Sequence, residues 1–121
     1  MNKLIYIISD KPSIEFKKQL INFMPKEFKI IDIGLFDIDE NVEHTELVRE
    51  VYEKLYEHPK ALGIICDSEN VDLCKLVNEY DNLKAIDGLG SRISDFNVIC
   101  INTFLMNEEE AKSLIKNKLN F

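Results

Sequence analysis

The amino-acid sequence predicts an α/β fold: a three-layer, doubly wound, five-stranded parallel sheet of Rossmann-like type. Apolar runs with strand character alternate with helical segments through five units along the chain, and this alternation is typical of a parallel sheet with helices on both faces. The apolar run at residues 61–66 contains no polar residue, which indicates a central strand buried on both faces. With 121 residues, of which 45% are hydrophobic, the chain fits one domain over residues 1–121.

Local patterns place the individual elements. Strands are expected at residues 4–8, 28–33, 62–66, 83–86 and 97–101, and helices at residues 12–24, 44–58, 70–80 and 107–118. Pro12 suits the first turn of a helix, whereas Pro25 and Pro59 end the first two helices. Asn107 and the glutamate three residues on form a capping-box pattern. On the first helix, Lys17 is expected at the edge of the apolar face.

Composition excludes several classes of function. The net charge is −7 and no basic cluster is present, so binding to nucleic acid or to an anionic membrane is not expected. The first apolar run is too short for a signal peptide or a membrane span. Three cysteines, an odd number, argue against a disulfide framework and favour a reducing, cytoplasmic location. His44 and His58 have no partner at ligand spacing, so we expect no structural zinc site.

Polar residues follow four of the five expected strands, at residues 9–10, 66–68, 87–91 and 102–103. The carboxyl ends of parallel strands meet at one edge of the sheet, which is where open α/β folds bind ligands. Asp10 and Asp67 at this edge offer an alternative, a magnesium site of the kind found in phosphorylation receiver domains. That alternative is disfavoured, because Asp10 is a single carboxylate and no lysine follows the fifth strand.

Cys66 at the end of the central strand has two interpretations. A cysteine there is either a catalytic thiol or a small buried apolar side chain, and Asp67–Ser68 is also a common helix-capping pair. No glycine occurs at residues 67–72 to let backbone N–H groups approach a phosphate. The carboxylates in that stretch favour the start of a helix, but they repel an anion.

Four stretches, residues 4–20, 30–34, 62–66 and 95–99, carry a resemblance that covers most of the chain. The first contains a strand, a Ser-Asp pair and a helix, and the second is a strand that ends in Gly34. The third is the strand that ends in Cys66, and the fourth reads Asp-Phe-Asn-Val-Ile. In this order they resemble the ribose-5-phosphate isomerase B and galactose-6-phosphate isomerase family of sugar-phosphate isomerases.

The resemblance implies aldose–ketose isomerisation of a phosphorylated sugar without a cofactor. In such a reaction a base moves a proton between two neighbouring carbons through an enediolate. Cys66 would be that base, as thiolate, and Asp10 would help to hold the sugar. The further substrate-binding residues would be Ser9, Asp67, Ser68 and Asn97. The resemblance also implies a homodimer, or a complex with a related subunit.

Several positions depart from the family pattern. Lys11 stands where the family has a histidine after the Ser-Asp pair, Ile93 stands where it has the ring-opening histidine, and residues 67–71 replace its glycine-rich loop. The carboxylates of Asp67 and Glu69 are expected to raise the pKa of the neighbouring thiol. Three interpretations therefore remain open. The chain is a divergent active isomerase, a weakly active subunit completed by a different chain, or a non-enzymatic binding or structural domain on the same scaffold.

Overall fold

The structure is a computed structural model, and it describes residues 3–36, 42–69, 72–86 and 96–121. Five strands form one sheet in the order β2-β1-β3-β5-β4, and every neighbouring pair is parallel. The strands are β1 (Lys3–Ser9), β2 (Phe28–Asp32), β3 (Leu62–Asp67), β4 (Ala85–Ile86) and β5 (Val98–Asn102). This arrangement confirms the predicted doubly wound fold, and the central strand, β3, runs one residue past the cysteine, to Asp67.

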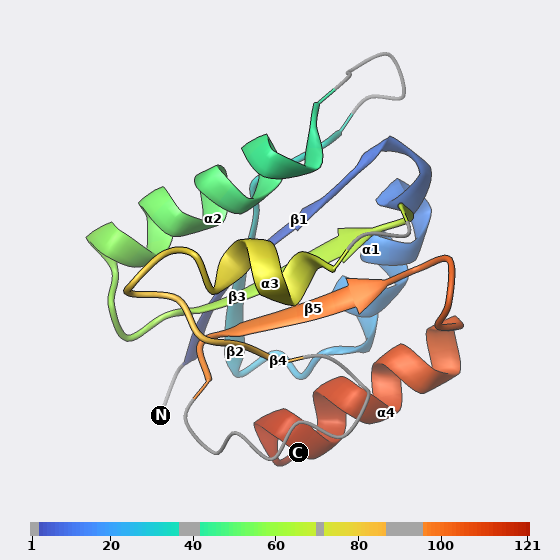
Figure 1. Ribbon diagram of the computed structural model, residues 1–121. Coiled ribbons are helices and arrows are strands. Elements are labelled where there is room, and N and C mark those ends of the chain that lie inside the picture. Colours follow the sequence, from blue (N-terminus) through green and yellow to red (C-terminus); the bar gives the residue numbers. More distant parts are fainter. Residues whose placement is uncertain (1–2, 37–41, 70–71, 87–95) are drawn as a thin grey trace.

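Helices cover both faces of the sheet (Figure 1). Helices α2 (His44–Glu57) and α3 (Leu73–Val77) pack on one face, where the side chains of Tyr6, Ile8 and Ile65 belong to the buried core. Helices α1 (Ile14–Phe23) and α4 (Glu108–Leu119) pack on the other. A short 3₁₀ turn, η1 (Lys11–Ser13), leads from β1 into α1. The two apolar layers leave the polar strand ends at the rim of the sheet.

Two predicted elements are much shorter in the structure. The helix expected at residues 70–80 is α3, which begins after an Asp72 cap and ends at Val77; residues 70–71 lie outside the described chain. The strand expected at residues 83–86 is only Ala85–Ile86. Its start is shortened because the N–H of Leu83 donates to the carbonyl of Tyr80, so the chain is still turning there. None of the described helices has the length and apolar character needed to cross a membrane.

The expectation for Lys17 was wrong. Its side chain is not at the edge of the apolar face but is only 1% exposed, among the most buried in the described chain. The capping box predicted for the last helix is confirmed, because Asn107 caps α4 together with Glu110. A helical stripe shows that position 17 points toward the sheet, but it does not show how deeply the position is covered.

Candidate functional site

The carboxyl ends of β1, β3 and β5 lie next to one another (Figure 1). Strand register pairs Ser9 with Cys66 and Asp67 with Asn102. Alternation along the strands places Ser9 and Cys66 on the face covered by α1 and α4, and Asp67 on the opposite face. The edge therefore has polar groups in two layers. The expected contribution of residues 87–91 lies outside the described residues.

The side chain of Asp10 joins two segments of this edge. Its Oδ1 accepts the backbone N–H of Ser13 at 3.1 Å, which closes the turn into α1. Its Oδ2 accepts the backbone N–H of Ser68 at 2.9 Å and the Ser68 hydroxyl at 2.7 Å. Asp10 thus joins the segments that follow β1 and β3 and holds Ser68 in place.

Cys66 is completely buried among apolar side chains of the α1/α4 layer. Burial strongly raises the pKa of its thiol; the nearby Lys17 cation opposes this, and the Asp10, Asp32 and Asp67 carboxylates add to it. The thiol is therefore protonated at neutral pH in the structure as described. The two interpretations of Cys66 both remain open. Its place near the carboxyl end of β3 is the one expected of a catalytic thiol, whereas its complete burial is typical of a small apolar side chain.

Two buried polar atoms of the edge have no hydrogen-bond partner within the described chain, Ser9 Oγ and Asp67 Oδ2. The other oxygen of Asp67 accepts the backbone N–H of Glu69 at 2.7 Å. Burial, first of all, raises the pKa of Asp67 to about 6, and the Asp10 charge adds to the rise. Unsatisfied buried polar atoms are rare in folded proteins and mark places that a ligand, a water molecule or a proton completes.

Lys17 is a site component that the sequence did not reveal. Its Nζ donates at 2.8 Å to Asp32 Oδ1, to the carbonyl of Gly34 and to the carbonyl of Leu35. The N–H of Leu35 in turn donates to the carbonyl of Ser9, so the lysine holds the segment after β2 against the end of β1. The sequence contained one indication of this ion pair: a lysine lies within an otherwise apolar helix stripe, and an aspartate ends the second strand.

A second contact ties η1, the turn before α1, to the residue that follows β5. The hydroxyl groups of Ser13 and Thr103 lie 2.7 Å apart, and the N–H of Thr103 donates to the carbonyl of Asp67. Residues 102–103 thereby reach the edge as the sequence predicted. The amide of Asn102 also donates to the carbonyl of Glu69, at 3.3 Å.

Asn97 is not brought together with the other predicted site residues. It lies at the amino end of β5, where its side chain accepts the N–H of Lys84 at 2.7 Å and donates to the carbonyl of Asn82 at 2.6 Å. It lines a cavity of about 460 Å³ at this opposite edge of the sheet. Its hydrogen bonds fasten the start of β5 to the segment before β4.

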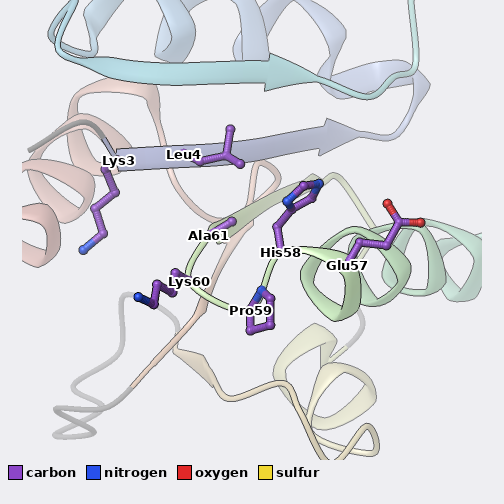
Figure 2. Close-up of a pocket in the computed structure, with 7 residues that line it drawn as sticks. All are labelled: Lys3, Leu4, Glu57, His58, Pro59, Lys60 and Ala61. Atoms are coloured by element: carbon purple, nitrogen blue, oxygen red, sulfur yellow. The ribbon is translucent and has the colours of Figure 1, made fainter.

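A larger cavity of about 580 Å³ opens beside it, next to the turn between α2 and β3 (Figure 2). Its walls come from Leu4, His58, Pro59 and Ala61, with Lys3 and Lys60 at its rim. Both cavities lie at the amino ends of the strands, away from Cys66 and Asp10. No group of three or more potential metal-ligating side chains occurs among the residues that the structure describes, so Asp10 and Asp67 have no third protein ligand there.

Comparisons with known proteins agree on one family. The family model described as Ribose/Galactose Isomerase matches residues 5–120. The search of curated proteins finds no match.

Solved structures with the same fold include ribose-5-phosphate isomerases B from several organisms. That of Mycoplasma genitalium, with bound ribulose-5-phosphate, is 22% identical with a TM-score of 0.82, over 96% of this chain and 82% of that one. The Thermotoga maritima structure is 19% identical with a TM-score of 0.82, over 97% and 86%. The Trypanosoma brucei type B enzyme is 16% identical with a TM-score of 0.84, over 98% and 86%.

Proposed function

The chain belongs to the ribose/galactose isomerase family, and from this premise we propose that it binds a phosphorylated sugar at the carboxyl edge of its sheet and interconverts its aldose and ketose forms. The observation that carries the proposal is the junction at Asp10. This carboxylate bonds Ser68 beside the end of the strand that bears Cys66. Polar groups from two neighbouring strand ends thus converge at the place where this fold class binds its ligands.

The proposed chemistry is a proton transfer between two neighbouring carbons of the open-chain sugar. A base takes the proton from the carbon beside the carbonyl, and the electrons of the broken C–H bond form the enediolate. The same base then returns the proton to the former carbonyl carbon. The hydroxyl proton of the neighbouring carbon passes to the former carbonyl oxygen, and the electrons of that O–H bond form the new carbonyl. We assign the base to Cys66 and the holding of sugar hydroxyls to Asp10, with Ser9, Asp67 and Ser68 as further contacts. Asn97 is left out because it lies at the other edge.

The lone chain is expected to be a slow catalyst. A thiol acts as a base only as thiolate, whereas burial and three carboxylates hold the Cys66 thiol in its protonated form. This observation favours a second candidate, a subunit whose site is completed by another chain, as in a homodimer or a complex with a related subunit. In that arrangement the present chain supplies the scaffold and part of the sugar contacts.

An isomerase assay tests the proposal directly. The purified protein is offered ribose-5-phosphate and galactose-6-phosphate, and formation of the ketose is followed. We expect turnover that is slow and that Cys66→Ala abolishes, because the substitution removes the base. Cys100→Ala is the matched control, since it removes a buried thiol from β5 on the opposite face of the sheet.

The assay also separates the candidates. Equal loss of turnover in both cysteine variants would point to damaged packing and remove Cys66 from the mechanism. Thermal stabilisation by a sugar phosphate without turnover would favour the subunit role, because a ligand that binds only the folded state raises its stability. If neither turnover nor stabilisation is seen with either sugar, the proposed function is wrong for the isolated chain.

A further inference from the structure

We propose that the amino edge of the sheet, where the strands begin, holds a second binding site, which takes a small organic anion built on a flat apolar ring. The site consists of the two adjoining cavities of about 580 and 460 Å³. None of the residues to which the proposed function assigns a sugar contact lines either cavity. The inference therefore goes beyond the proposed function and does not depend on it.

The larger cavity has a mostly apolar wall (Figure 2). Leu4 of β1 and Ala61, just before β3, contribute aliphatic side chains, and His58 and Pro59 contribute rings. The His58 ring also packs on Tyr6 of β1, with 5.9 Å between the ring centroids, which fixes it beside the strand. Aromatic rings pack well on surfaces of this kind. The volume is within the range of cavities that hold small organic molecules.

Two exposed lysines stand where the cavities adjoin, because Lys3 and Lys60 line both of them. Among the described residues each cavity has one carboxylate in its wall, Glu57 in the larger and Asp81 in the smaller. In Figure 2 the Glu57 carboxylate lies at the opposite end of the larger cavity from both lysines. Neither ammonium group forms an ion pair within the part of the chain that the structure describes. Both can therefore contact an anion at the boundary of the cavities.

This local excess of cations contrasts with the charge of the whole chain, which is −7. In the smaller cavity Lys84 is a third lysine beside Lys3 and Lys60. The three are far apart in the sequence, so no basic cluster is visible there. Charges more than about 8 Å away are largely screened at physiological ionic strength, so the nearby lysines dominate the attraction. An apolar wall beside such cations fits a molecule with its ring in the larger cavity and its anionic group at the boundary.

Amide NMR of the nitrogen-15-labelled protein tests where such a ligand binds, with 1-naphthyl phosphate as the probe. We expect the amide signals of Leu4, His58 and Ala61 to shift to saturation, because these residues line the larger cavity. The signals of Asp10 and Ser68, at the carboxyl edge, should stay in place. The proposal is wrong if the signals of Leu4, His58 and Ala61 do not shift to saturation.

Two further compounds test the class of ligand. The compound 1-naphthol has the ring without the anionic group, and inorganic phosphate is an anion without the ring. We expect 1-naphthyl phosphate to bind about tenfold more tightly than either, because it contacts the apolar wall and the lysines together. Equal affinity for 1-naphthol would remove the lysines from the site, and equal affinity for phosphate would remove the apolar wall. Either result overturns the proposed ligand class.

Charge variants test the role of the lysines. Lys3→Gln and Lys60→Gln should each weaken binding of 1-naphthyl phosphate about fivefold, because each removes one cation from the boundary of the cavities. Lys18→Gln on α1 is the matched control, since it changes the net charge by the same amount and should leave the affinity unchanged. All three side chains are exposed, so the substitutions should preserve the fold. Equal effects of the three substitutions, or no effect of any, would overturn the site.

Competition separates this site from the proposed sugar site. An excess of ribose-5-phosphate should not displace 1-naphthyl phosphate, because a sugar phosphate has no apolar ring to fill the larger cavity. Displacement would show that both compounds bind at one place, which overturns the second site. Loss of the proposed function has a different signature: no isomerase turnover and no stabilisation by a sugar phosphate, with 1-naphthyl phosphate still bound at the amino edge.

Discussion

Lys17 fastens residues 32–35, at and after the end of β2, to helix α1 through a single ammonium group. The group lies in the α1/α4 layer and neutralises Asp32, while its other two hydrogen bonds satisfy the carbonyl oxygens of Gly34 and Leu35. Among the residues that the structure describes, it is also the only group that lowers the pKa of Cys66. A buried charge is tolerated where it is paired and hydrogen-bonded, and this lysine satisfies both conditions.

Replacing Lys17 with methionine should destabilise the protein by about 3 kcal/mol, because the substitution leaves a partly buried carboxylate and two carbonyl oxygens without their donor. Urea denaturation measures the loss. Lys18→Met at the adjacent exposed position is the matched control and should change stability by less than about 0.5 kcal/mol. Equal, small effects of both substitutions would show that Lys17 is not the cation that holds this edge together.

At the scale of elements, the close approach of α2 to β3 depends on Gly63. A Cβ atom at this position would lie 2.7 Å from Cγ1 of Val51 and 3.5 Å from Cδ1 of Leu55, both on α2. The strand therefore carries no side chain where the helix crosses it. This contact sets how deeply α2 sits on the sheet, and with it the position of the strand that presents Cys66 and Asp67.

Gly63→Ala should cost about 2 kcal/mol of unfolding free energy, because a methyl group must be fitted into a filled layer. Combining it with Val51→Ala should recover part of that cost, since the second substitution removes the clashing atom. A double-mutant cycle with a coupling energy of about 1 kcal/mol or more would establish the contact. If the free-energy changes of the two substitutions add, α2 shifts to make room for the methyl group and the contact does not limit how closely it packs.

At the scale of the whole molecule, both described cavities lie at the edge opposite the proposed site. The carboxyl edge is formed by closely bonded residues, with Cys66 and Asp67 fully covered. A chain of this size and fold presents little binding surface of its own there. Assembly of two chains is therefore expected to supply the remainder of the site.

We predict a homodimer in solution. Sedimentation velocity at micromolar concentration should give a mass of about twice the 14.1 kDa of the chain. The reason is that an incomplete site at the carboxyl edge gains its missing walls from a second copy. A single species of the chain's own mass, unchanged by addition of a sugar phosphate, would contradict this expectation and weaken the subunit interpretation.

The sequence by itself determined the layers, the order of the elements and the gathering of polar strand ends at one edge. These features follow from apolar periodicity and from the direction of parallel strands, both of which are local properties. It also located Cys66 near the end of the central strand, one residue before the last, Asp67. The ends of β4 and α3 were less well predicted, because turns stabilised by backbone hydrogen bonds replaced regular structure at residues 78–84.

Only the tertiary structure decided which polar groups touch. The bonds between Asp10 and Ser68, and between Lys17 and the segment after β2, join residues that are far apart in the sequence. The same is true of the burial of Cys66 and of the separation of Asn97 from the other site residues. Burial and charge pairing depend on what packs around a group in three dimensions, so a residue pattern indicates where a carboxyl or thiol group lies but not whether it carries a proton.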